Sequence, residues 1–278
     1  MNVFYIDGSF VPENEAVLPV TDLAVLRGYG VFDFLRTYNG VPFHLQEHLE
    51  RLERSARLIG LTLPVSTDEL SSIVGQTLDK NGYPESNIRL VVTGGDSEDG
   101  ISPGPNPRLM VMVTQLWEMP QEWYRDGVKV ITAHLDRYMP EAKSINYIPA
   151  ILNLREARDR QAIESLYVNP LGYIKEGTTS NFFAFFGNTL VTPPDRILPG
   201  VTRKTVLELA AKEFTVEERE IHKDEIRLMD EAMLSSSNKE IVSVVKIDSV
   251  SLPGGGPGER VQRVAALFQE YTDRYGKQ

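Results

Sequence analysis

The chain has 278 residues, no cysteine and a formal net charge of −10. This length suffices for two modest domains with a sizeable core. The lack of cysteine excludes disulfides, thiolate metal sites and a cysteine nucleophile, and the acidic balance argues against a nucleic-acid-binding protein. The sequence has no run of about 18 apolar residues and no secretory signal pattern at its start, so we expect a cytoplasmic protein without a membrane segment.

Two histidines have the spacing that a pair of metal ligands on one helix face would need. His44 and His48 are four residues apart. The residues around them supply no convincing third ligand for a metal ion. We therefore expect no metal site in this chain.

The first part of the chain predicts a small domain of strands and two helices. The dipeptides Asp7-Gly8 and Asn39-Gly40 are typical of tight hairpin turns. Apolar residues recur at helical spacing over 44–59 and 66–81. A Gly/Pro-rich acidic loop, residues 94–107, is expected to be mobile or to face the substrate. Strands are expected over residues 2–6, 9–11, 31–38, 41–43, 87–93 and 108–114.

The periodic pattern lapses over residues 116–127, which we interpret as a linker. It separates a small N-terminal α/β domain, residues 1–115, from a larger C-terminal domain, residues 128–278. The alternation of short strands and helices predicts a two-domain α/β protein of the α+β type, with a pocket at the domain junction. In the larger domain we expect strands over 128–133, 165–168, 172–175, 181–186, 189–192, 231–234 and 242–248, and helices over 148–161, 203–213 and 259–275.

Lys143 is the candidate for the chemistry of the protein. It follows a predicted apolar strand and precedes Tyr147 by four residues. A single lysine in a loop is usually a solvated surface charge. Here a carboxylate follows among small polar residues, because Glu176 opens the segment EGTTSN. An amine and an acid of this kind are the partners that a pyridoxal cofactor requires.

Two further segments are suited to binding a phosphate. Gly200, Val201 and Thr202 lie at the start of a predicted helix, where free N–H groups and the helix dipole favour an anion. The hydroxyl-rich segment from Ser235 to Asn238 is expected to be a turn of similar character. An amine that can form a Schiff base, a carboxylate that can keep a pyridinium protonated, and two anion sites together describe a pyridoxal phosphate pocket.

The order and spacing of these segments resemble the class IV pyridoxal phosphate enzymes. That group includes D-amino acid transaminases, branched-chain amino acid transaminases and aminodeoxychorismate lyases, and the resemblance covers nearly the whole chain. It implies the two-domain class IV aminotransferase-like fold, pyridoxal 5′-phosphate as cofactor, amino acid and 2-oxo acid substrates, and a homodimer. The matching segments are Arg27–Phe32, His48–Arg51, Glu141–Tyr147, Glu176–Asn181, Leu198–Arg203 and Ser235–Glu240.

The resemblance implies a role for each residue of these segments. Lys143 would form the Schiff base and later move the proton between the substrate Cα and the cofactor. Glu176 would pair with the pyridine nitrogen, Tyr147 would bind the ring hydroxyl, and Leu198 would pack on the ring face. The other cofactor-binding residues, mostly around the phosphate, would be Arg51, Gly200, Val201, Thr202, Ser236 and Ser237.

The residues that would bind the substrate carboxylate match neither transaminase pattern fully. Well-known D-amino acid transaminases use a tyrosine and an Arg-x-His pair, where this chain has Phe32 and residues 99–101. Branched-chain enzymes share Phe32 and Arg89, but have tyrosines where this chain has Arg27 and Asn87. The resemblance therefore leaves substrate choice open.

Arg27 and Arg89 supply two cations, one of which could come from across a dimer interface. Two such charges suit a dicarboxylate such as glutamate or 2-oxoglutarate. We expect a ping-pong transaminase acting on D-glutamate or D-alanine with 2-oxoglutarate or pyruvate. The alternatives are a branched-chain L-amino acid transaminase, an aminodeoxychorismate lyase and a non-catalytic cofactor-binding protein. The expected substrate-binding residues are Arg27, Phe32, Arg89, Thr178, Thr179 and Asn238.

Overall fold

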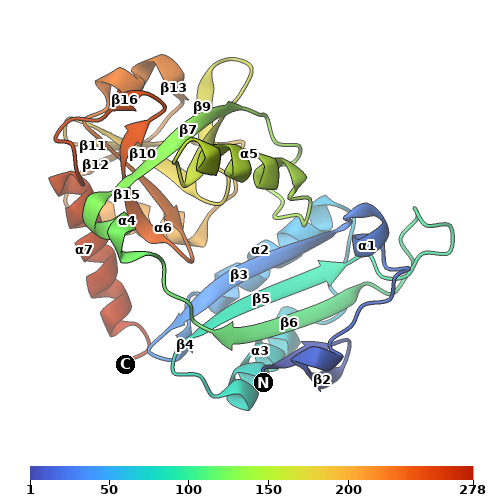
Figure 1. The fold of residues 1–278 in the computed structure, drawn as a ribbon. Helices are drawn as coiled ribbons and strands as arrows, with labels where there is room; N and C mark the ends of the chain where they lie inside the picture. Colours follow the sequence, from blue (N-terminus) through green and yellow to red (C-terminus); the bar gives the residue numbers. More distant parts are fainter. Residues whose placement is uncertain (278) are drawn as a thin grey trace. The chain divides into compact units, whose positions relative to one another are not determined.

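The computed structural model describes residues 1–277, which divide into two compact units (Figure 1). Unit 1 comprises residues 1–117, residues 142–147 and the C-terminal residues from Arg274. Unit 2 comprises residues 118–141 and 148–273. Among the described residues, each helix is too short or too polar to cross a membrane.

Unit 1 is built on a six-stranded antiparallel sheet of order β2-β1-β6-β5-β3-β4. The hairpin turns at Asp7-Gly8 and Asn39-Gly40 have the positive φ angles that these residues tolerate best. The strands are β1 Val3–Ile6, β2 Ser9–Pro12, β3 Gly30–Tyr38, β4 Val41–Pro42, β5 Ser86–Thr93 and β6 Arg108–Gln115. The helices are α1 Leu23–Arg27, α2 Leu45–Leu58 and α3 Thr67–Asn81, with a 3₁₀ turn η1 at Glu13–Glu15.

Helices α2 and α3 cover one face of this sheet and enclose the core of unit 1 (Figure 1). Strand residues Ile88, Leu90 and Val92 alternate toward the helices, as a half-buried strand requires. The other face therefore carries the residues between them, including Arg89. The helix residues of the core are Leu49, Leu52, Ala56, Leu70, Ile73 and Val74, which follow the three- and four-residue spacing of an amphipathic helix.

Unit 2 contains a ten-stranded sheet of order β12-β11-β10-β14-β15-β7-β8-β9-β13, with β16 paired to β15. A bridge between Asn181 and Glu176 also joins β10 to β9, so the strands from β10 to β9 close into a ring. The strands are β7 Val128–His134, β8 Glu164–Val168, β9 Tyr173–Gly177, β10 Asn181–Phe186, β11 Thr189–Thr192, β12 Thr215–Glu218, β13 Ile221–His222, β14 Glu231–Ser236, β15 Glu240–Ile247 and β16 Val250–Ser251.

The helices of unit 2 are α4 Gln121–Asp126, α5 Ile148–Asp159, α6 Val201–Ala210 and α7 Glu259–Arg274, with a 3₁₀ helix η2 at Lys223–Leu228. The core includes Leu166, Ile174, Phe182 and Val242, which lie on four strands of the ring. Phe185 is buried against Phe214, with ring centroids 5.1 Å apart. Phe182, Phe183 and Phe185 of β10 are thus part of the core of the sheet.

The units differ from the predicted domains in three places, the first being that the C-terminal residues from Arg274 belong to unit 1. Helix α4 occupies residues 121–126, inside the predicted linker. The segment Ala142–Tyr147 belongs to unit 1, although it follows a strand of unit 2. The reason is the open edge of β3, where Ser144 pairs with Val31 and Ile145 N donates to Gly30 O at 3.0 Å.

Some predicted element boundaries were wrong or incomplete. Strand β14 continues to Ser236, so Ser235 and Ser236 end a strand and the turn begins at Ser237. The sequence reasoning did not find α1, whose five residues are too few to show periodicity. It also missed the short strands β12, β13 and β16.

Candidate active site

Lys143 lies in unit 1, on the segment that extends the open edge of β3. Its carbonyl accepts from Phe32 N at 2.9 Å, and its amide donates to Ser55 Oγ at 3.1 Å. Ser55 is fully buried on α2. The Lys143 Nζ lies 4.7 Å from the centroid of the Phe32 ring. The sheet edge and α2 together therefore fix the position of this amine.

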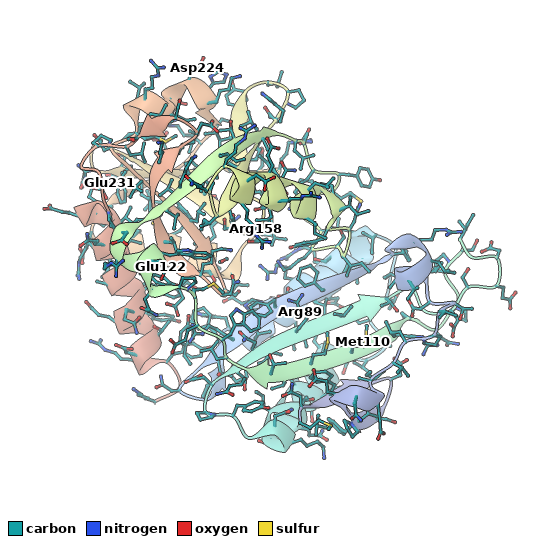
Figure 2. All side chains as sticks on the ribbon, in the orientation of Figure 1. Arg89, Met110, Glu122, Arg158, Asp224 and Glu231 are labelled. Carbon is teal, nitrogen blue, oxygen red and sulfur yellow. The ribbon has the colours of Figure 1, made fainter. Side chains whose placement is uncertain are left out.

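Two further predicted residues, Tyr147 and Arg89, lie around the Phe32 ring with Lys143. The Tyr147 ring meets Phe32 edge to face, with centroids 5.3 Å apart. Arg89 lies on β5 (Figure 2). Its guanidinium carbon is 5.4 Å from the Phe32 centroid and 5.3 Å from that of Phe34. Desolvation lowers the pKa of Arg89, and the nearby Tyr147 opposes that shift. An amine and a guanidinium thus contact one aromatic ring.

Behind this face, a buried charge cluster joins β3 to α2. The His48 Nδ1 is 2.6 Å from Asp33 Oδ1, and Arg51 donates to both Asp33 oxygens at 2.8 and 2.9 Å. Burial raises the pKa of Asp33, but the contacts with Arg51 and His48 outweigh this effect and hold that pKa well below its usual value. Burial lowers the pKa of His48, and this outweighs the attraction of Asp33, so the imidazole is neutral.

This cluster bears on two sequence predictions. Arg51, predicted to bind the cofactor phosphate, is buried and forms a bidentate ion pair with Asp33. Its role toward a phosphate stays a prediction. His44 and His48 have different partners, because His44 pairs with Glu47 at 3.1 Å. Among residues 1–277 no group of three or more His, Asp or Glu side chains has the arrangement of a metal site.

In unit 2 the Glu176 carboxylate is buried and held from two sides. Its Oε2 accepts from Leu198 N at 2.9 Å, and its Oε1 pairs closely with Arg137. Asn181 Nδ2 donates to Leu198 O at 2.9 Å, so the two side chains fix the Leu198 backbone. The Arg137 guanidinium favours the ionised carboxylate. The result is a fixed acceptor suited to a protonated ring nitrogen.

Helix α6 begins close to this acceptor, because its N-cap Gly200 follows two residues after Leu198, which donates to Glu176. Gly200 is the N-cap and provides no side-chain cap. A Cβ on Gly200 would lie 2.1 Å from Asn181 Oδ1, so only glycine allows the backbone this close. Val201 and Thr202 are buried in the first turn. The predicted helix start is confirmed, and its geometry suits an anion.

Two hydroxyl groups near these residues have no hydrogen-bond partner in the part of the chain that the structure describes. The strand register places Glu176, Asn181 and Ser235 side by side on β9, β10 and β14. Thr178 Oγ1 and Ser235 Oγ are buried and, within the described residues, make no hydrogen bond. Buried hydroxyls are normally satisfied. These two therefore point to a polar ligand.

The other predicted residues of this region lie in the turn after β9, at the end of β14 and in the turn that follows β14. Thr179 Oγ1 accepts from Lys239 Nζ at 2.7 Å. Ser236 Oγ donates to Asn238 Oδ1 at 2.9 Å, and Ser237 follows Ser236 at the start of the turn. Their positions place the predicted cofactor and substrate residues of unit 2 on neighbouring strand ends.

Arg27 is not part of the Phe32 cluster in this chain. It ends α1 and is exposed, and its Nη1 donates to Leu26 O at 2.8 Å. Within residues 1–277 no hydrogen bond or ring contact joins Arg27 to Phe32 or Arg89.

The family model for class IV aminotransferases matches residues 30–247. The chain belongs to the class IV aminotransferase family. A Methanocaldococcus jannaschii protein, provisionally named a branched-chain-amino-acid aminotransferase, is 31% identical over 98% of this chain and 97% of its own. The D-alanine aminotransferase of Bacillus licheniformis is 30% identical to this chain, over 95% of this chain and 94% of its own.

Solved structures are also similar to this chain over almost its whole length. The Escherichia coli branched-chain amino acid aminotransferase has a TM-score of 0.92 and 26% identity, covering 99% of this chain and 97% of its own. The T.th. branched-chain amino acid aminotransferase, solved with pyridoxamine 5′-phosphate, has a TM-score of 0.92 and 25% identity over 99% and 96%. The predicted family and mixed α/β fold are thereby confirmed.

Pyridoxal 5′-phosphate is the cofactor of this family, and the residues of the aminotransferase fit it. Unit 2 has a buried carboxylate for the ring nitrogen and a helix start without a side-chain cap for the phosphate. It also has the hydroxyls of Thr178 and Ser235, which make no hydrogen bond among residues 1–277. Unit 1 has the amine of Lys143. Sequence reasoning missed Asp33, Ser55 and Arg137 among the residues that hold these groups. Of these three residues, only Asp33 could have been recognised from the sequence, because it is a charged residue on the buried face of an apolar strand.

Proposed function

We propose that this aminotransferase transfers the amino group of a D-amino acid, such as D-glutamate or D-alanine, to 2-oxoglutarate or pyruvate. The observation that carries the proposal is the shared contact of Lys143 Nζ and the Arg89 guanidinium with the Phe32 ring. A cation so close to the reacting amine suits the α-carboxylate of an amino acid. The 30% identity to a D-alanine aminotransferase supports the D-amino acid reading.

The proposed roles follow from the chemistry of each side chain. Pyridoxal phosphate, when bound, supplies an aldehyde for amines and a ring that accepts electrons. Lys143 Nζ holds the cofactor and moves the proton at the substrate Cα. Glu176 keeps the proton on the ring nitrogen, Tyr147 donates to the ring hydroxyl, and Leu198 supports the ring face. The proposed phosphate ligands are Arg51, Gly200, Val201, Thr202, Ser236 and Ser237.

We propose that Arg27 reaches the substrate from the partner subunit of a homodimer. Arg27 is exposed at the end of α1, beside the exposed apolar side chains of Val25 and Leu26. Leu26 and Arg27 both lie against Gly100, and the next residue, Ile101, is 71% exposed. An exposed apolar surface of this kind suits a protein partner. A second cation from there would favour dicarboxylate substrates.

A branched-chain L-amino acid aminotransferase is the second candidate. Phe34 packs against Trp117, with centroids 5.7 Å apart, and the Phe32 and Phe34 rings line the same face as Arg89. Apolar walls of this kind suit an aliphatic side chain. The solved branched-chain enzymes are also similar along the whole chain.

A half-reaction screen distinguishes the two candidates. The holoenzyme is mixed with one amino acid and no acceptor, and the 2-oxo acid released per subunit is measured. D-glutamate, D-alanine and their L-forms are compared with D- and L-leucine. Release from the D-forms alone is expected. Release from L-leucine without release from either D-glutamate or D-alanine would establish the branched-chain activity instead.

Replacing Arg89 tests the proposed carboxylate contact. Arg89→Ala is expected to raise the KM for the amino acid by about 10- to 100-fold, because a charge-assisted hydrogen bond is lost. The matched control is Arg36→Ala, since Arg36 lies on the same sheet but over the Tyr38 ring, at 4.4 Å. An equal rise in KM in both variants would contradict the assignment.

A further inference from the structure

Unit 2 contains a buried ion pair that none of the roles above uses. Glu164 is the first residue of β8 and is fully buried. Lys239 lies in the turn between β14 and β15 and is 5% exposed. The Lys239 Nζ is 2.8 Å from Glu164 Oε1. Burial raises the pKa of Glu164, but Lys239 and the hydroxyls of Ser180 and Thr179 lower it by more than burial raises it. The carboxylate is therefore charged.

The pair connects two turns that are distant in sequence. In the turn after β9, Ser180 Oγ donates to Glu164 Oε2 at 2.5 Å, and Thr179 Oγ1 contacts Glu164 Oε1 closely. Lys239 Nζ donates to the same Thr179 hydroxyl at 2.7 Å. On its own turn, the Lys239 amide donates to Ser236 Oγ at 3.3 Å. The ion pair therefore ties residues 177–180 to residues 236–239.

The backbone at Gly177 leaves room for the Glu164 carboxylate. A Cβ on Gly177 would lie 2.3 Å from Glu164 Oε2 and 2.4 Å from Ser180 Oγ. A side chain at this position, one residue after Glu176, would displace the Glu164 carboxylate and the Ser180 hydroxyl. The close approach places the buried charge directly beneath the turn that carries Thr178.

Stability alone does not account for such a pair. Removing two charges from water costs free energy that their attraction only partly offsets, and apolar replacements are often neutral or stabilising. Thr178 lies in the first of these turns, and Ser235 ends β14 just before the second; among residues 1–277 the Oγ1 of Thr178 and the Oγ of Ser235 are buried without a hydrogen-bond partner. A ligand that bonds both hydroxyls needs the turns at a fixed separation.

We propose that the Lys239–Glu164 ion pair is a positioning device, which locks the turn 177–180 to the end of β14 and the turn 237–239, so that the Thr178 and Ser235 hydroxyls can bind the cofactor or its substrate together. This rests on the proposed roles of the two turns. It does not depend on whether the substrate is a D- or an L-amino acid.

The test separates positioning from stability with a neutral pair of similar shape. In Lys239→Met alone, Glu164 is left as an unpaired buried charge, so a lower Tm and weaker cofactor binding are expected. In the double variant Glu164→Gln with Lys239→Met, the Tm of the cofactor-free protein is expected to return to the wild-type value. The dissociation constant for pyridoxal phosphate, measured by dialysis of the holoenzyme without amino acid, is expected to stay about 10- to 100-fold raised, as for other lost supporting contacts.

A matched control is available in the same unit. Lys175 is 4% exposed and pairs with Glu220 at 2.5 Å, but its contacts involve neither turn. The double variant Lys175→Met with Glu220→Gln is expected to leave the dissociation constant unchanged. Cofactor binding within twofold of wild type in the Glu164/Lys239 double variant would overturn the proposal. So would a Tm as low as that of the single variant, because the pair would then be purely structural.

Because no amino acid is present, this outcome is independent of the substrate screen. A failure of the D-amino acid assignment would appear in the half-reactions alone. A failure of the positioning proposal would appear in cofactor retention alone.

Discussion

His48 carries a prediction that belongs to a single side chain. It is fully buried, its Nδ1 contacts Asp33, and Arg51 already supplies the counter-charge of that carboxylate. Since burial lowers the pKa of His48, the imidazole stays neutral in the folded protein at pH values where it is protonated in the unfolded chain. The folded protein thus binds fewer protons than the unfolded chain.

The sign of the pH dependence follows from this difference. The unfolded pKa is about 6.5, so the stability that neutral His48 confers is fully present above that pH and is lost as the pH falls below it. The free energy of unfolding of the wild type, measured with urea, is expected to fall as the pH is lowered from about 7.5 to about 5, across that pKa. His48→Asn keeps a donor toward Asp33 and should flatten the slope. Parallel slopes in both proteins would refute the assignment.

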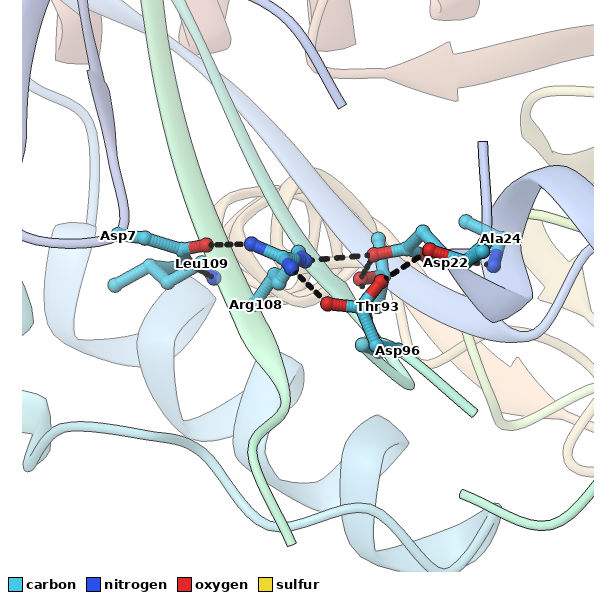
Figure 3. A network of polar contacts seen from close by, with 9 residues as sticks. Asp7, Asp22, Ala24, Thr93, Asp96, Arg108 and Leu109 are labelled. Atoms are coloured by element: carbon cyan, nitrogen blue, oxygen red, sulfur yellow. Dashed lines mark hydrogen bonds and ion pairs between the residues drawn. The ribbon is translucent and has the colours of Figure 1, made fainter. Parts of the chain in front are cut away.

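At the level of elements, the short helix α1 is held by one polar network (Figure 3). Asp22 caps α1 by accepting from Ala24 N at 2.7 Å, and its other oxygen accepts from Thr93 Oγ1 at 2.8 Å. Arg108 lies 3.3 Å from Asp22 and pairs with Asp7 at 2.7 Å. The helix that ends in Arg27 is therefore fixed to the ends of β5 and β6.

Replacing Asp22 by alanine is expected to lower the free energy of unfolding by about 2–3 kcal/mol. About 1 kcal/mol is the loss of the cap, and the rest comes from the buried Thr93 hydroxyl left without its acceptor. Urea unfolding measures the change. Asp96→Ala is the control, because Asp96 also pairs with Arg108 but is half exposed and should matter little. Equal losses in both variants would contradict the role given to the cap.

The same elements illustrate what the sequence can and cannot predict. Helices α2 and α3 were predictable because 14 and 15 residues display the apolar spacing fully. Helix α1 was not, because its signal is one capping aspartate and a following glycine. Lys143 and Glu176 could be proposed from their neighbours in the chain. The partners Ser55 and Arg137 could not, since each depends on which elements pack together.

At the scale of the whole molecule, the net charge of −10 opposes an anionic substrate, so recognition depends on local cations. Arg89 stands with Lys143 at the Phe32 ring, whereas Arg27 lies exposed on α1. A cation at an exposed helix end can act on a substrate held by another subunit. The proposed homodimer would then complete each site with Arg27 of the partner subunit.

Mixed dimers test this arrangement directly. Arg27→Ala and Lys143→Ala homodimers are each expected to be inactive or weakly active on dicarboxylates. Co-expression of the two chains in equal amounts would make half of the dimers mixed, and one site in each would combine an intact Lys143 with the partner's Arg27. Activity is therefore expected to recover to about a quarter of wild type, as two-fold symmetry dictates. If Arg27 instead served its own chain, no site would hold both residues, and mixing the variants would restore nothing.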